Sequence, residues 1–161
     1  MQWVYDFAGA DKQRRYNTNK SAFWRIIHQV ARGFYPSGEE LLHVCWSNVC
    51  KIAPDGANPD NKLYGAQLDV CRRIMRKELE IFSPKHVVML TGQSWARDFL
   101  YFLNDGQHTQ SVASYPWGSE KEYDVKVYEI ADTFFYLSEH PQCKDESTHA
   151  AALIRAISDN M

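Results

Sequence analysis

Residues 86–103 read HVVMLTGQSWARDFLYFL, and this stretch decides the fold class. Its first part, 86–91, is a short apolar run of the kind found in strands that are covered on both faces. Gly92 then turns the chain into a helix that carries Trp95 and Phe99 among its apolar residues. A strand, a tight turn and a helix make half of a parallel βαβ unit, so the sequence predicts an α/β protein.

Similar patterns elsewhere predict the remaining elements. We expect helices at 21–33, 64–82 and 145–158, and strands at 41–46, 124–130 and 133–138, with a short strand near Val112. Together they predict a three-layer α/β/α sandwich with a mostly parallel central sheet. With 161 residues the chain fits a single domain, 1–161, in which residues 1–20 are expected to be mostly irregular.

Composition limits the classes of partner. The chain is 45% hydrophobic and 24% charged with a formal charge of -2, so no global cationic field would draw it onto nucleic acid. Such binding would need a local patch. The candidate is the cluster Arg72, Arg73, Arg76 and Lys77, for which the alternative is a solvated helix face.

The sequence also bears on the cellular compartment. No apolar run approaches the length of a membrane span. The N-terminal residues do not form a positively charged segment followed by an apolar stretch, as a signal peptide would. The four cysteines contain no Cys-x-x-Cys pair, which suits reduced thiols better than a disulfide framework. We therefore predict a cytoplasmic protein without a membrane partner.

Three loops follow predicted buried strands: SNVCK after 41–46, TGQS after 86–91 and SEHPQ after 133–138. In open α/β sheets, ligands bind outside the carboxyl ends of the strands. We therefore expect the three loops to meet at one edge of the sheet and to carry the functional site.

The first two loops offer groups that recognise ligands. Asn48 presents an acceptor and a donor on one amide, as reading the edge of a heterocyclic base requires, although Asn is also a common turn residue at strand ends. Gly92, Gln93 and Ser94 place backbone amides at a helix N-terminus, where a phosphate or carboxylate could bind. The alternative is an ordinary βα turn.

The third loop offers a catalytic group. His140 precedes Pro141, whose fixed φ angle stiffens the chain at the sheet edge. A stiffly held imidazole could donate a hydrogen bond to an anion that forms in the cleft. The alternative is a structural or solvent-exposed histidine.

The order and spacing of these features over residues 41–158 resemble the uracil-DNA glycosylase superfamily, in particular its thermophile-type branch. That branch has a strand, an Asn followed by hydrophobic residues and a Lys, a loop rich in Pro and Asn, a long helix, a Pro-Lys-hydrophobic strand, a Gly turn, and finally a His-Pro motif before the last helix. The corresponding features in this sequence are Asn48, Lys51, residues 53–61, residues 64–82, Pro84 with Lys85, Gly92, and His140 with Pro141.

The resemblance implies a function in DNA repair. In this superfamily a base is flipped out of the stack, an Asn amide recognises the pyrimidine, and the His of the His-Pro loop stabilises negative charge on the uracil oxygen as the N-glycosidic bond breaks. By analogy Asn48 would recognise the base and His140 would be catalytic, in a metal-free hydrolysis. Trp46 would belong to the core rather than form a stacking platform.

The sequence departs from the superfamily in two places. The superfamily has an early strand that ends in a Gly-rich motif with a water-activating side chain, and here Asp6 is the nearest candidate, without such a motif. Either the sequence begins downstream of that strand or the group has been lost. The His-Pro motif is followed by polar residues instead of an apolar wedge, and Glu139 and its acidic neighbours would repel phosphates. We therefore expect single-stranded or unpaired nucleic acid, or a nucleobase, as the ligand.

No cofactor is expected. The thermophile-type branch holds an iron-sulfur cluster on four cysteines, and Cys71 lies near one of those positions, but Ile52 occupies the position of another. We predict no cluster and no metal. Two alternatives to an enzyme stay open: a non-catalytic glycosylase-like binding or assembly module, and a nucleotide- or anion-binding α/β protein that uses the TGQS turn.

Overall fold

Four strands form one mixed sheet in the computed structural model, which describes residues 18–161. The strand order is β1 (His86–Leu90), β4 (Thr133–Ser138), β3 (Tyr123–Ile130) and β2 (Ala113–Trp117). Only β1 and β4 are parallel, and the other two pairs are antiparallel. The α/β class is confirmed, but the prediction of a mostly parallel sheet is wrong. Asp6 and most of the segment expected to be irregular lie outside the described residues.

The antiparallel pairing has a simple cause in chain length. Ile130 and Thr133 are register partners, so only Ala131 and Asp132 join β3 to β4. Ala131 has a φ of 51°, as a tight hairpin turn requires. A parallel pair needs a crossover of a dozen or more residues, which a two-residue connection cannot provide.

The predicted strand at 41–46 is also wrong. The segment begins instead with a 3₁₀ helix, η2 (Glu40–His43), and continues as extended chain that pairs with no strand of the described sheet. Glu40 fixes this conformation, because its buried carboxylate accepts hydrogen bonds from the Gly38 amide at 2.5 Å and from Arg32 Nε at 2.9 Å. Leu41 is fully buried while Leu42 is 69% exposed, so the apolar run does not reflect a strand covered on both faces.

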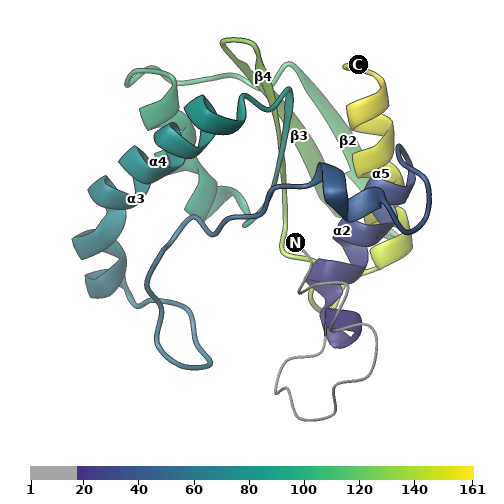
Figure 1. Cartoon of the computed structure of the whole chain (residues 1–161), viewed down its shortest axis with the longest axis horizontal. Coiled ribbons are helices and arrows are strands. Elements are labelled where there is room, and N and C mark those ends of the chain that lie inside the picture. The colour runs from purple at the N-terminus through teal and green to yellow at the C-terminus, as the bar shows by residue number, and fades with distance from the viewer. Residues whose placement is uncertain (1–17) are drawn as a thin grey trace.

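Helices cover both faces of the sheet, as predicted. On one face lie α2 (Ala22–Arg32) and α5 (Glu146–Ser158), and on the other lie α3 (Asn61–Phe82) and α4 (Gln93–Leu103) (Figure 1). A short 3₁₀ helix, η1 (Thr18–Lys20), precedes α2. Each face has its own apolar core. Strand residues alternate between them, so that in β4 Phe135 and Leu137 join the α3/α4 core and Tyr136 joins the α2/α5 core.

Local sequence signals account for the helix ends. Asp60 caps α3 by accepting a hydrogen bond from the Leu63 amide at 2.8 Å. At the other end Ser83 adopts the left-handed conformation and Pro84 prevents continuation. None of the helices in residues 18–161 is both long and apolar enough to cross a membrane.

Candidate functional site at the carboxyl edge of β1 and β4

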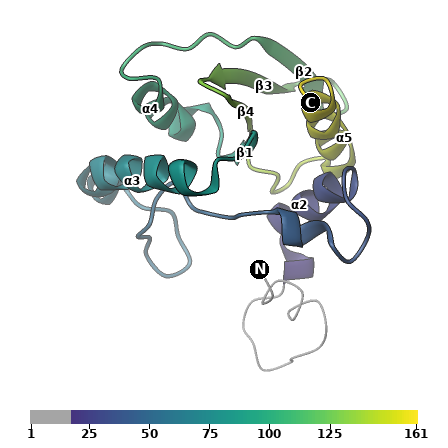
Figure 2. The same cartoon turned by 45° about the horizontal axis from the view of Figure 1, so that its top comes forward.

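The parallel pair β1 and β4 brings two of the three predicted loops together. Leu90 and Ser138, the last residues of these strands, are register partners. Just beyond them the Gly92 amide donates a hydrogen bond to the carbonyl oxygen of Ser138 at 3.0 Å. The turn that begins α4 and the loop that contains His140 are therefore neighbours at one edge of the sheet (Figure 2).

Gly92 is required at this turn for two reasons. Its φ of 71° is a conformation that other residues adopt only with strain. A Cβ atom at this position would also lie 3.0 Å from Oε2 of Glu139. The backbone amide of Gly92 donates its hydrogen bond to Ser138. Of the three residues predicted to bind an anion, only Gln93 and Ser94, which are exposed in the first turn of α4, could still offer a backbone amide to it.

His140 is exposed at the same edge, and one face of its ring stacks on Phe23 of α2 with 6.4 Å between ring centroids. Its Nδ1 lies 3.3 Å from the Gln142 amide, which donates to it. With Nδ1 as acceptor, the proton of the neutral ring is on Nε2. Partial burial, and then the charge of Lys144, lower the pKa of His140. At neutral pH the ring is therefore an uncharged donor.

Burial and several hydrogen bonds hold the His-Pro loop in place. Pro141 is buried, and its carbonyl accepts from the Lys144 amide at 3.2 Å. The Lys144 ammonium donates to the His140 carbonyl at 3.0 Å. Asp145 caps α5 directly after the loop. Glu146 then binds Arg25 of α2 through two hydrogen bonds of 2.5 and 2.8 Å.

A buried stack of rings lies beneath this loop. Trp117 is 2% exposed and packs in parallel against His149, with ring centroids 3.8 Å apart, and against Tyr123 at 4.6 Å. The Trp117 indole donates to the Ser138 hydroxyl at 3.1 Å. His149 is fully buried, and within residues 18–161 neither of its ring nitrogens has a hydrogen-bond partner. Burial, followed by the charges of Lys144 and His140, lowers its pKa to about 4.

Sequence reasoning missed this stack. Trp117 falls between the short strand expected near Val112 and the strand expected at 124–130, where only its place after Pro116 next to Tyr115 could have indicated an edge strand. His149 lies on a predicted helix next to residues that do face the core, but nothing in the sequence indicates that it pairs with Trp117.

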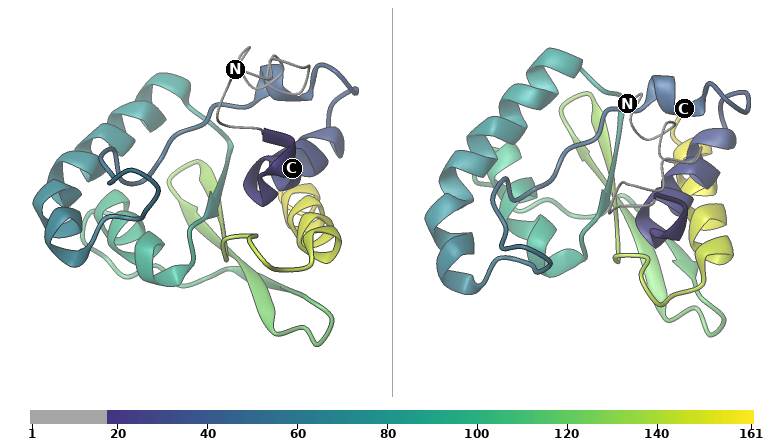
Figure 3. Two further views of the ribbon diagram at one scale, coloured as in Figure 1. Left: turned by 90° about the horizontal axis from the view of Figure 1, so that it is seen from below. Right: turned by 60° about the horizontal axis from the view of Figure 1, so that its bottom comes forward.

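Asn48 lies on the extended segment that crosses between the two faces of the sheet (Figure 3). Its side chain is exposed. Trp46, two residues earlier, is 42% exposed and packs against Trp24 with 5.6 Å between centroids, whereas Val49 packs into the α3/α4 core. The approach of Asn48 to the other two loops stays a prediction.

The chain just after Asn48 is anchored to α3 by one side chain. Gln67 is 7% exposed, and its Oε1 accepts from the amides of Lys51 at 3.0 Å and Ile52 at 2.9 Å. Its Nε2 donates to the Ile52 carbonyl at 2.8 Å. This three-bond clamp fixes the end of the segment that carries Asn48.

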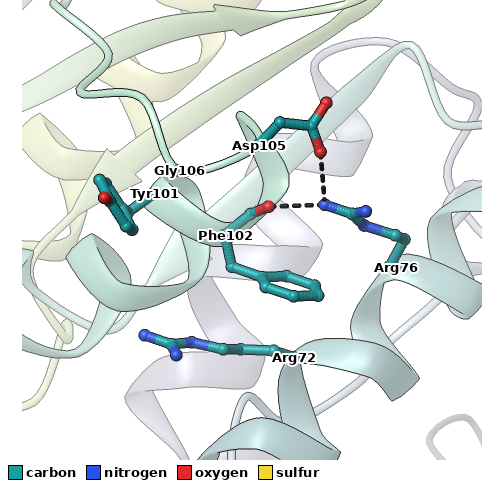
Figure 4. A pocket seen from close by; sticks show the side chains of 6 residues that line it. All are labelled: Arg72, Arg76, Tyr101, Phe102, Asp105 and Gly106. Atoms are coloured by element: carbon teal, nitrogen blue, oxygen red, sulfur yellow. Dashed lines mark hydrogen bonds and ion pairs between the residues drawn. The ribbon is translucent and has the colours of Figure 1, made fainter.

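The basic cluster on α3 has partners within the protein. Arg72 donates to the Asp98 carbonyl at 3.0 Å, and Arg76 donates to the Phe102 carbonyl at 2.6 Å and to Asp105 at 3.1 Å (Figure 4). Arg73 and Lys77 form ion pairs along the helix. A cavity of about 300 Å³ lies between the two arginines and the C-terminal end of α4, at the opposite end of that helix from Gly92. These contacts favour a role in joining α3 to α4.

The described cysteines are all free thiols. Cys71 is buried and its Sγ lies 3.3 Å from Oε1 of Gln67. Within residues 18–161, no three or more His, Cys, Asp or Glu side chains gather closely enough to hold a metal ion. The absence of an iron-sulfur cluster stays a prediction.

The fold and this edge define the class of protein: an α/β domain in which a Gly turn and a His-Pro loop meet at the carboxyl ends of two parallel strands. A sequence model of the Uracil DNA glycosylase superfamily matches residues 7–146. The chain belongs to that superfamily. No curated protein and no solved structure matches it significantly.

Proposed function

We propose that this protein hydrolyses the N-glycosidic bond of an unpaired pyrimidine base, of the uracil type, in single-stranded nucleic acid. The observation that carries the proposal is the hydrogen-bond pattern of His140, whose Nδ1 accepts from the Gln142 amide. This leaves a neutral Nε2–H at the edge where the Gly92 turn and the His-Pro loop meet.

The chemistry follows from where charge develops. When the bond between sugar and base breaks, its electron pair stays on the base and appears largely on a carbonyl oxygen. A donor that is already held in place stabilises this charge without reorganisation. The Lys144 contact to the His140 carbonyl and the buried Pro141 hold the imidazole in such a position.

Base selection would come from Asn48. Its amide can donate to and accept from the edge of a pyrimidine at the same time. An unpaired base is the better substrate, because leaving a duplex costs a few kcal/mol of unpairing and unstacking. The acidic residues Glu139, Asp145 and Glu146 border the loop and disfavour close approach of a second phosphate strand.

The test is release of free uracil from a single-stranded oligonucleotide with one uracil. We expect turnover by the wild type and a loss of about 10²- to 10³-fold in kcat for His140→Ala, as for removal of one fixed donor. His108→Ala serves as the matched control, because His108 is exposed and follows the far end of α4. Equal rates for the wild type and His140→Ala would remove His140 from the mechanism.

A second candidate, a non-catalytic binding module, is favoured by the acidic border of the loop, which adds negative charge where a nucleic acid would dock. The same oligonucleotide assay distinguishes the enzyme from the binding module. Absence of uracil release from the oligonucleotide, in a protein that unfolds cooperatively, would support the binding module.

The anion-binding alternative is less well supported by the contacts at the turn. The amide of Gly92 is used by Ser138, and the Glu139 carboxylate lies against the turn where an anion would bind.

A further inference from the structure

Three acidic residues, Glu139, Asp145 and Glu146, are close to His140 in the sequence, and two of them have structural partners. Asp145 caps α5 through its Oδ1, and Glu146 is paired with Arg25 at 2.5 and 2.8 Å. Among residues 18–161 no group donates a hydrogen bond to the carboxylate of Glu139. The described residues therefore leave the acceptor capacity of this carboxylate unused.

The Glu139 carboxylate has a defined place. Its Oε2 and Oε1 lie 3.0 and 3.3 Å from the position that a Cβ of Gly92 would occupy, so the missing side chain of Gly92 makes room for it. Gly92 is the N-cap of α4, an 11-residue helix. The Glu139 carboxylate therefore lies beside the partially positive N-terminal end of α4.

Glu139 and His140 point to opposite sides of the sheet edge. Ser138 bonds Trp117 on the α2/α5 side, Glu139 lies against the Gly92 turn that begins α4, and His140 stacks on Phe23 of α2. This continues the alternation of β4. In a hydrolytic displacement, water attacks the sugar carbon from the face opposite the departing base. A water acceptor and a leaving-group donor should therefore lie on opposite sides of the scissile bond.

We propose that Glu139 is the catalytic base that activates the attacking water in the hydrolysis proposed above, on which this inference rests. As the water oxygen bonds to the anomeric carbon, the Glu139 carboxylate takes one water proton. The carbon–nitrogen bond breaks with its electron pair on the base, whose oxygen accepts from Nε2–H of His140. The proton on Glu139 then passes to the base nitrogen, directly or through solvent, giving a sugar hydroxyl, a free base and the carboxylate again.

The experiment compares Glu139→Gln with the wild type on the single-stranded uracil oligonucleotide. Gln keeps the size of the side chain and removes its basicity. We expect kcat to fall by about 10²- to 10⁴-fold, the usual range for a general base. The acid side of the pH–kcat profile should flatten, because the titrating base is gone. Binding of the oligonucleotide should stay equal or become tighter, because a negative charge has been removed.

The matched control is Glu129→Gln, an equally conservative change at an exposed position of β3 opposite Phe134, at the other end of the sheet. It should keep wild-type kcat. Glu139→Gln within about threefold of the wild type, while His140→Ala is impaired, would overturn the role of Glu139 and leave the proposed function standing. Absence of uracil release by the wild type would overturn both.

Discussion

The His-Pro loop and the segment that carries Asn48 are both predicted parts of one site, but they are held in different ways. The His-Pro loop leaves a strand inside the sheet, is bonded to the neighbouring Gly92 turn, and rests on the buried ring of Trp117. The Asn48 segment pairs with no strand of the described sheet and is held near its two ends, by Trp46 packing on Trp24 and by the Gln67 clamp.

Under the proposed function, this difference corresponds to the difference between the catalytic group and the recognition group. A donor that stabilises a transition state must be held rigidly, because small displacements cost much of its effect. A recognition residue on a less constrained segment can close on a base after it enters. We therefore expect perturbations beneath the His-Pro loop to lower kcat, and perturbations of the Asn48 anchors to raise KM.

The largest expected effect is that of Trp117→Ala. Removing a buried Trp costs about 3 to 5 kcal/mol of unfolding free energy and leaves the Ser138 hydroxyl without its donor. Trp46→Ala is the comparison on the other segment, and since Trp46 is 42% exposed the loss should be about 1 kcal/mol. Urea unfolding measures both. Equal losses would show that the two segments are supported alike.

As pH falls, the contribution to unfolding free energy from the residues beneath the His-Pro loop should be lost before that from the residues that hold the Asn48 segment. His149 has a folded pKa of about 4 against 6.5 for the free side chain, so its contribution to stability is full above pH 6.5 and is lost as pH falls toward 4. The loss should be about 2 to 3 kcal/mol. His149→Phe keeps the ring stack and should remove this dependence. If stability depends on pH in the same way in the wild type and in His149→Phe, His149 is not the source of the dependence.

Glu40 provides an internal reference for the same titration. Burial alone would raise the pKa of Glu40, but hydrogen bonds from the backbone, Arg32 and His28 prevail and lower it from 4.5 to about 2. Its contribution is therefore present above pH 4.5 and is lost only as pH falls toward 2. The loss of stability from Glu40 should therefore occur at lower pH than the loss from His149, with only a small overlap near pH 4.

The Gln67 clamp is the next test. Gln67→Met keeps the volume but leaves two amides and one carbonyl of the 51–52 chain without partners, which should cost about 2 kcal/mol. Uracil release should show a raised KM with kcat nearly unchanged, because His140 and its supports are untouched. A fall in kcat as large as that of His140→Ala would show that the two regions act as one unit.

The sequence predicted best what local patterns determine. The strand–turn–helix at 86–103, the helix ends at Ser83 and Asp145, and the strands at 124–130 and 133–138 follow from the apolar period and the cap residues, and all are present. The spacing also indicated the superfamily, through Gly92 and the His-Pro motif.

Sequence-based prediction failed where contacts between distant residues determine the structure. The run at 41–46 has a strand-like composition, but the bonds of Glu40 to Gly38 and Arg32 make it begin as a 3₁₀ helix. The mostly parallel sheet was expected from the βαβ signal, and the two-residue turn at Ala131 overrides that signal for β3. The stacking of His149 on Trp117 joins residues 32 positions apart by an interaction without a sequence signature.

The smallest expected effect is that of Gly92→Ala. A positive φ and the crowding against Glu139 should together cost about 1 to 2 kcal/mol. Gly65→Ala is the matched control, because Gly65 lies exposed within α3 with nothing near its Cβ position, and the change should stabilise by about 0.5 to 1 kcal/mol. The kinetic consequence is the sharper one: a Cβ at position 92 displaces the Glu139 carboxylate and leaves the hydrogen bond to His140 Nδ1 intact. Gly92→Ala should then lower kcat with little change in KM, while Gly65→Ala changes neither, and a normal kcat in a folded Gly92→Ala protein would count against the catalytic placement of Glu139.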